Sequence, residues 1–179
     1  MRASLEAEGL DGLLVSHLPN VRYLTGFTGS AALLLIRRDA TVLISDFRYE
    51  AQAPAEVASV ATVEIDQRSV WDRLGRVLEA TTVATVGFEA TSLTVRDAER
   101  LSGLTRARVQ PTRELVERQR QSKSPEEVAA IRAAAELAQE ALREVLPGIR
   151  TGQTELEVAA ALEARLRQKG SEWHPFPTI

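Results

Sequence analysis

The chain has 179 residues, of which 44% are apolar and 26% charged, and its formal net charge is −3. This length accommodates one domain and the opening of a second, and the lack of a basic surplus gives no support to a nucleic-acid or anionic-membrane partner. The sequence has no cysteine, which excludes disulfides, thiolate catalysis and zinc–thiolate sites. Its first residues are too polar for a secretory signal and no apolar run approaches membrane-spanning length, so we expect a cytoplasmic protein.

Helical and extended patterns alternate through residues 1–112. These patterns predict strands at 12–16, 31–36, 41–45, 60–65, 83–88 and 107–109, and helices at 2–8, 19–24, 49–57, 69–80 and 94–101. The polar link 37–40 between two apolar runs indicates an antiparallel hairpin, whereas the helices between other strands indicate crossovers. We therefore predict an α/β domain with a mixed six-stranded sheet flanked by helices. Pro54 argues for a kink or break within the helix at 49–57.

The character of the chain changes after Pro111, and residues 114–121 are strongly charged. We place a linker at 113–123, because Ser124 then suits a helix N-cap and forms a capping box with Glu127. Apolar residues follow at helical spacing, namely Val128, Ile131, Ala135, Ala138, Leu142 and Val145. A second capping box, Thr154 with Glu157, predicts another helix that ends before Gly170.

These signals predict a domain at 1–112, the linker at 113–123, and the opening of a second domain at 124–179. The apolar face of the helix that starts at Ser124 needs a layer to cover it. The final apolar run, 173–179, is typical of a strand that is just beginning. We therefore expect the second domain to be truncated in this chain.

Most candidate catalytic groups have a simpler structural interpretation. The two histidines, His17 and His174, have no second ligand at metal-binding spacing, so backbone hydrogen bonding and packing are the favoured roles. Ser16 and Ser30 lack the glycine context of a serine-hydrolase nucleophile. The glycine-rich stretch 26–30 lacks the lysine of a phosphate loop. None of these residues indicates a catalytic centre.

Two clusters that combine polar and aromatic residues leave a choice open. One contains Asp46, Arg48 and Tyr49 directly after a predicted strand, where binding residues often gather. The other contains Asn20, Arg22 and Tyr23, after the first strand. The alternative is a structural ion pair of Asp46 with Arg22 or Arg48, and residue chemistry favours that alternative.

Several of these segments together resemble the creatinase, prolidase and aminopeptidase P family. Residues 19–30 and 46–53 resemble its N-terminal domain, and 123–127 together with 131–134 resemble the entry into its "pita-bread" catalytic domain. Residues 148–155 and 176–179 continue the match in order. The resemblance implies a creatinase-type N-terminal domain followed by the first helices of a truncated pita-bread domain.

The resemblance also implies an activity for the full-length parent: a dinuclear metal hydrolase that cleaves the peptide bond before proline. Two divalent ions, manganese, cobalt or zinc, would activate a bridging water. In the family pattern all the metal ligands follow residue 179, so we expect no catalytic residue and no metal ligand in this chain, and no hydrolysis by it alone. Two alternatives remain open: a creatinase-like C–N hydrolase, and a non-catalytic binding module of the same fold.

In such enzymes the N-terminal domain shapes the substrate cleft and takes part in dimerisation. The resemblance therefore implies proline-containing peptides as substrates and a homodimer as the assembly. It also suggests which residues form the cleft-facing or dimer-interface surface: Asn20, Arg22, Tyr23, Asp46, Arg48 and Tyr49.

Overall fold

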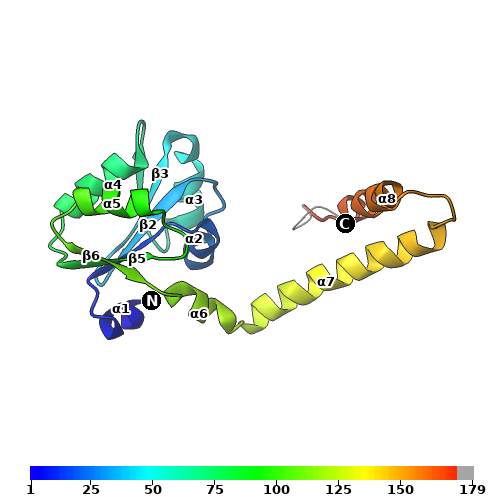
Figure 1. The fold of residues 1–179 in the computed structure, drawn as a ribbon, viewed down its shortest axis with the longest axis horizontal. Helices are drawn as coiled ribbons and strands as arrows, with labels where there is room; N and C mark the ends of the chain where they lie inside the picture. Colours follow the sequence, from blue (N-terminus) through cyan, green and yellow to red (C-terminus); the bar gives the residue numbers. More distant parts are fainter. Residues whose placement is uncertain (173–179) are drawn as a thin grey trace. The chain divides into compact units, whose positions relative to one another are not determined.

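The computed structural model describes residues 1–172, and the chain divides into two compact units, Met1–Gln121 and Ser122–Ile179 (Figure 1). His174 and the strand expected at 173–179 lie outside the described residues. Within those residues, no helix is long and apolar enough to cross a membrane.

The first unit is built on a six-stranded sheet with the order β4-β3-β2-β1-β5-β6. Its strands are β1 (Gly12–Val15), β2 (Ala32–Arg37), β3 (Thr41–Asp46), β4 (Thr62–Asp66), β5 (Thr85–Glu89) and β6 (Arg108–Thr112). Its helices are α1 (Arg2–Ala7), α2 (Leu18–Thr25), the 3₁₀ turn η1 (Phe47–Tyr49), α3 (Gln52–Val57), α4 (Val70–Glu79), α5 (Val95–Gly103) and α6 (Leu115–Gln121).

The sheet is mixed, as the sequence predicts. Strands β1, β2 and β3 pair antiparallel, and the predicted hairpin is β2–β3, with Ala32 opposite Ser45. The pairs β3–β4 and β5–β6 are parallel, because α3 and α5 connect their strands as crossovers. The pair β1–β5 is also parallel. The α/β class and the six-stranded mixed sheet are thus confirmed.

Both faces of the sheet are covered, which gives three layers. Along β1, Leu13 and Val15 pack into one core and Leu14 into the other, because successive side chains of a strand point to opposite faces. The first core includes Val21 of α2 and Val57 of α3. The second core lies under α4 and α5, which cover the same face in Figure 1.

The predicted helix at 49–57 is interrupted. The chain forms η1, and α3 then starts at Gln52, so Pro54 is its third residue. A proline is tolerated there because the N–H groups of the first turn have no intrahelical acceptor. The interruption that Pro54 predicts therefore lies before the proline.

The segment where we expect a linker contains α6. Leu115 and Val116 of this helix are buried and pack in the first core. Glu114, immediately before the helix, has a positive φ of 56°, in a region that residues other than glycine rarely adopt. The first unit is therefore folded up to its last residue, Gln121, and includes α6.

The second unit consists of α7 (Pro125–Val145), the 3₁₀ turn η2 (Leu146–Gly148) and α8 (Glu155–Gln168) within its described residues. Both predicted capping boxes are present, at Ser124 and at Thr154. Among the unit's described residues only Ala141 is buried, and Ile131 on the apolar stripe of α7 is 56% exposed. The helices thus follow their local signals while their apolar side chains stay largely exposed.

Candidate functional site

The loop 27–30 and η1 form one cluster, although 19 residues separate Ser30 from Tyr49. The Tyr49 hydroxyl accepts a hydrogen bond from the Ser30 backbone N–H at 2.9 Å and lies 2.7 Å from Ser30 Oγ. The Phe27 and Tyr49 rings meet edge to face with centroids 5.3 Å apart. The bonds from Ser30 lower the pKa of Tyr49, because they stabilise its phenolate. The loop is therefore held by Tyr49 of η1.

Gly29 makes this approach possible. A Cβ atom at this position would lie 2.3 Å from Phe27 Cζ and 2.7 Å from Tyr49 Cε1. Both distances are shorter than any ordinary contact between carbon atoms. The glycine is thus required by the close packing of the two rings, which explains the glycine-rich composition without a phosphate ligand.

Asp46 and Arg48 form a two-pronged ion pair on the surface. Arg48 Nε and Nη2 donate to the two Asp46 carboxylate oxygens at 2.9 and 2.7 Å, and Asp46 also caps η1 by accepting from Arg48 N–H. The side-chain bond from Arg48 lowers the pKa of Asp46, and the pKa of Arg48 is correspondingly raised. The Arg48 guanidinium lies 5.3 Å from the Tyr49 ring centroid, a cation–π arrangement. The predicted structural ion pair is confirmed, with Arg48 as the partner.

Glu56 of α3 completes the cluster, and sequence reasoning missed it. Its carboxylate accepts from Thr28 N–H at 2.8 Å, from Thr28 Oγ1 at 2.7 Å and from Gln52 Nε2 at 2.9 Å. These bonds, led by the Thr28 hydroxyl, lower the pKa of Glu56, and the charge of Arg22 contributes to the same shift. Glu56 lies 28 residues after Thr28 in the sequence, and the fold brings the two together. No local spacing could therefore have indicated this contact.

The cluster presents both charge and aromatic surface. Phe47 is 54% exposed and the Arg48 side chain is 54% exposed. Tyr23, on α2, is 38% exposed. Partly exposed aromatic and arginine side chains are the types enriched where proteins bind partners. The arrangement can therefore provide an exposed aromatic surface and a guanidinium that Asp46 holds in place.

Asn20 lies elsewhere, in a buried polar network. Its Nδ2 donates to Glu89 Oε1 and Glu117 Oε1, each at 2.6 Å, and its Oδ1 accepts from Arg120 Nη1 at 2.6 Å. Asn20 is completely buried, so its side chain is occupied within the first unit. Sequence reasoning missed Glu89, although a carboxylate at the end of an apolar strand run is a signal that could have indicated it.

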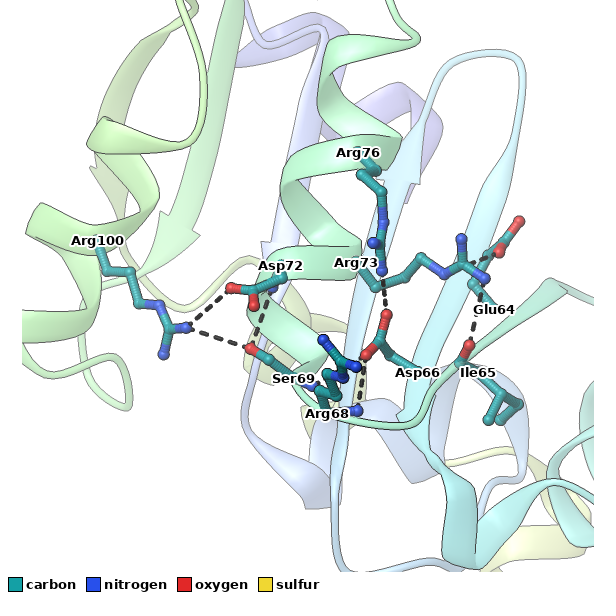
Figure 2. A network of polar contacts seen from close by, with 9 residues as sticks. All are labelled: Glu64, Ile65, Asp66, Arg68, Ser69, Asp72, Arg73, Arg76 and Arg100. Carbon is teal, nitrogen blue, oxygen red and sulfur yellow. Dashed lines mark hydrogen bonds and ion pairs between the residues drawn. The ribbon is translucent and has the colours of Figure 1, made fainter.

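A third polar cluster connects the edge strand β4 to α4 and α5 (Figure 2). Asp66 accepts from the backbone N–H groups of Arg68 and Ser69 at 2.8 and 3.0 Å and pairs with Arg76. Arg73 pairs with Glu64 at 3.3 Å. The charged residues of the cluster thus pair with one another or with backbone groups, so we interpret the cluster as a structural connection.

The described residues do not fit a metal centre. Across residues 1–172, no three His, Asp or Glu side chains converge in a way that could hold an ion.

Comparison with known families and proteins identifies the chain's relatives. Residues 1–122 match the family model of the Creatinase/Prolidase N-terminal domain. The chain belongs to this family. Residues 129–179 match Metallopeptidase family M24, so the two family segments follow one another in the order that the resemblance implies.

The individual relatives are peptidases. The chain is 36% identical to the uncharacterized peptidase YqhT of Bacillus subtilis, over 96% of this chain and 48% of that protein. It is 29% identical to a solved Xaa-Pro dipeptidase from Bacillus anthracis, with a TM-score of 0.90, covering 96% of this chain and 48% of that one. An X-Pro aminopeptidase from Thermotoga maritima has a TM-score of 0.86 at 28% identity, covering 94% of this chain and 49% of that one. The chain thus spans about half the length of these relatives.

Proposed function

We propose that this chain is the N-terminal part of an Xaa-Pro peptidase that hydrolyses the peptide bond before proline. One observation carries the proposal: 96% of the chain aligns with 48% of a protein whose structure was solved as an Xaa-Pro dipeptidase, with a TM-score of 0.90. The consecutive matches to the two family segments support it. The peptidase relatives favour this activity over creatinase-like C–N hydrolysis.

The whole protein would use two divalent metal ions, and we propose manganese, cobalt or zinc. The M24 match supports a metal-dependent hydrolase, in which a metal ion lowers the pKa of bound water. We further propose a cytoplasmic homodimer, and the absence of cysteine suits the reducing cytoplasm. We also propose the division into a domain at 1–112, a linker at 113–123 whose helix α6 packs on that domain, and a second domain from 124.

Within this enzyme, we propose that the exposed cluster around η1 faces the substrate cleft or the second subunit. Arg48 and Phe47 are each 54% exposed, and Tyr23 adds a partly exposed ring. The contacts of Asp46 and Tyr49 hold Arg48 and the loop in place, which reduces the entropy that binding must remove.

The activity is tested on the whole protein that contains this chain. The protein is incubated with Mn²⁺, Co²⁺ or Zn²⁺ in separate reactions. We expect it to release the first residue from Xaa-Pro peptides, and chromatography measures that release. The matched control is the same peptide with alanine in place of proline, which we expect to be cleaved much more slowly. Equal cleavage of both peptides, or none with any ion, would refute the proposal, and turnover of creatine would support C–N hydrolysis instead.

A further inference from the structure

Asn20 uses its hydrogen-bonding groups on contacts that span the first unit. The side chain is completely buried. Its two amide hydrogens are committed to Glu89 and Glu117, and its oxygen accepts from Arg120. An asparagine amide has only two donor hydrogens, so none is left for another partner. Asn20 therefore connects the end of β5 to α6.

The β5 end of this connection is firmly anchored. Glu89 is 5% exposed, and its Oε2 accepts from the backbone N–H groups of Ser16 at 2.7 Å and His17 at 2.8 Å. His17 is the N-cap of α2, where the helix dipole favours a negative charge. Ser92 Oγ donates to the same oxygen at 3.2 Å. The Glu89 carboxylate is thus fixed by the segment between β1 and α2 and by the loop after β5.

The α6 end of the connection combines apolar burial with polar contacts. Of its seven residues, Leu115 and Val116 are the buried ones, and Gln119 Nε2 donates to Ser4 Oγ at 3.3 Å. The helix is entered through Glu114 with its φ of 56°. A backbone conformation of this kind is unfavourable for a residue with a side chain and persists only where the surrounding structure imposes it. Something other than local preference therefore holds α6 in place.

We propose that Asn20, Glu89, Glu117 and Arg120 form a polar latch that holds α6 on the first unit and opens locally while the sheet remains folded. Because α6 ends at Gln121, the last residue of the first unit, the latch fixes the point from which the chain continues. Asn20 is then a positioning residue, separate from the exposed cluster at Arg48. The inference concerns the first unit alone and does not depend on the proposed peptidase activity.

Local opening requires less disruption than unfolding of the sheet. Release of α6 exposes two buried apolar side chains and relaxes the backbone at Glu114. Unfolding of the sheet would expose both cores, including Leu13, Leu14 and Val86. Segments with few buried apolar contacts open at lower free energy than the core. Release of α6 also breaks the hydrogen bonds of Asn20 to Glu117 and Arg120, so these bonds add to the free energy of opening.

Amide hydrogen exchange on the chain of residues 1–179 tests the latch. In Asn20→Ala, we expect exchange over residues 115–121 to become about tenfold faster or more, since two carboxylates lose a buried donor. Protection of β1, β2 and β5 should stay close to that of the unmodified chain. The matched control is Arg118→Ala, which removes an exposed arginine from the same helix and should leave exchange of α6 unchanged. Equal acceleration in α6 and in the strands, or none in α6, would overturn the latch.

A second pair of variants keeps the test decisive if Asn20→Ala does not fold. Glu117 is only half-buried, so substitutions there are compatible with a folded sheet. Glu117→Gln retains an oxygen that can accept from Asn20 and should retain protection of α6. Glu117→Ala removes the acceptor and should lose that protection by about tenfold. If the two variants protect α6 equally, the polar contact does not hold the helix and the proposal is wrong.

Discussion

Gly29 lies where the loop 27–30 passes closest to the rings of Phe27 and Tyr49. A methyl group there would overlap both rings, at 2.3 Å and 2.7 Å, so Gly29→Ala must displace at least one of them. Inserting atoms into a packed site typically costs about 1–3 kcal/mol, and we expect the free energy of unfolding to fall by that amount. Gly103→Ala is the control, since nothing lies within 4 Å of its added Cβ. Urea denaturation compares the two, and equal stabilities would show that the loop yields without cost.

The Tyr49 hydroxyl provides a spectroscopic probe of the same contact. Ser30 lowers the pKa of Tyr49 by hydrogen bonding to its oxygen. Ser30→Ala removes the side-chain bond but leaves the backbone N–H bond, so the pKa should rise part of the way toward the ordinary value for tyrosine. Titration of phenolate absorbance in a Tyr23→Phe background isolates the signal, because these are the two tyrosines of the chain. An unchanged titration would mean that the serine hydroxyl is not a donor to Tyr49.

Residues differ in how far sequence could predict their contacts. Asp46 and Arg48 are two positions apart, so their ion pair could be predicted from spacing alone. Asn20 and Glu89 are 69 residues apart, and their contact depends on β1 and β5 being neighbours. The sequence indicates that Asn20 is notable, but its burial follows from tertiary structure. Local chemistry therefore predicted the exposed half of the candidate site better than the buried network.

At the scale of elements, helix starts were the most predictable feature. Ser124 and Thr154 both form the capping boxes that their sequences indicate, because those bonds are local. The charged stretch before Ser124 was harder to interpret, since α6 shows few apolar residues and is stabilised by burial of Leu115 and Val116 against a distant core. A helix that depends on tertiary packing gives a weak local signal.

The connection of β4 to α4 yields a prediction about pH. Backbone N–H groups of Ser69 and Arg68 lower the pKa of Asp66 (Figure 2). A carboxyl whose folded-state pKa is lowered contributes stability above its unfolded-state pKa and loses it as the pH falls through the folded-state pKa. Asp66→Asn should therefore destabilise the first unit at neutral pH, and the difference from the unmodified chain should shrink in acid. Thermal unfolding across this pH range measures the effect.

Asp39→Asn is the control for Asp66, because it removes the same charge from a side chain that is 74% exposed. We expect the neutral-pH loss to be larger for Asp66→Asn than for Asp39→Asn. If the two variants show the same dependence on pH, the backbone bonds do not stabilise the Asp66 carboxylate and the connection between β4 and α4 does not depend on its charge.

For the whole molecule, the two units present different surfaces. The first unit covers both faces of its sheet, whereas α7 leaves Val128, Ile131 and Leu142 exposed among the described residues. A packed core can account for the fold of the first unit, so a residue on its surface can be tested for function without large effects on stability. Arg48 is such a residue, with its side chain 54% exposed.

Arg48→Ala in the whole protein therefore separates a structural role from a functional one. An exposed ion pair contributes about 0–1 kcal/mol to stability, so the melting temperature should change little. If Arg48 faces the substrate or the second subunit, its removal should raise KM or the dimer dissociation constant by about tenfold, which is typical for an arginine central to an interface.

Arg38→Ala is the matched control, because Arg38 is 55% exposed and also pairs with an aspartate. Steady-state kinetics on an Xaa-Pro peptide and analytical ultracentrifugation supply the two readouts, and a variant unchanged in both would leave Arg48 with only its role beside Asp46.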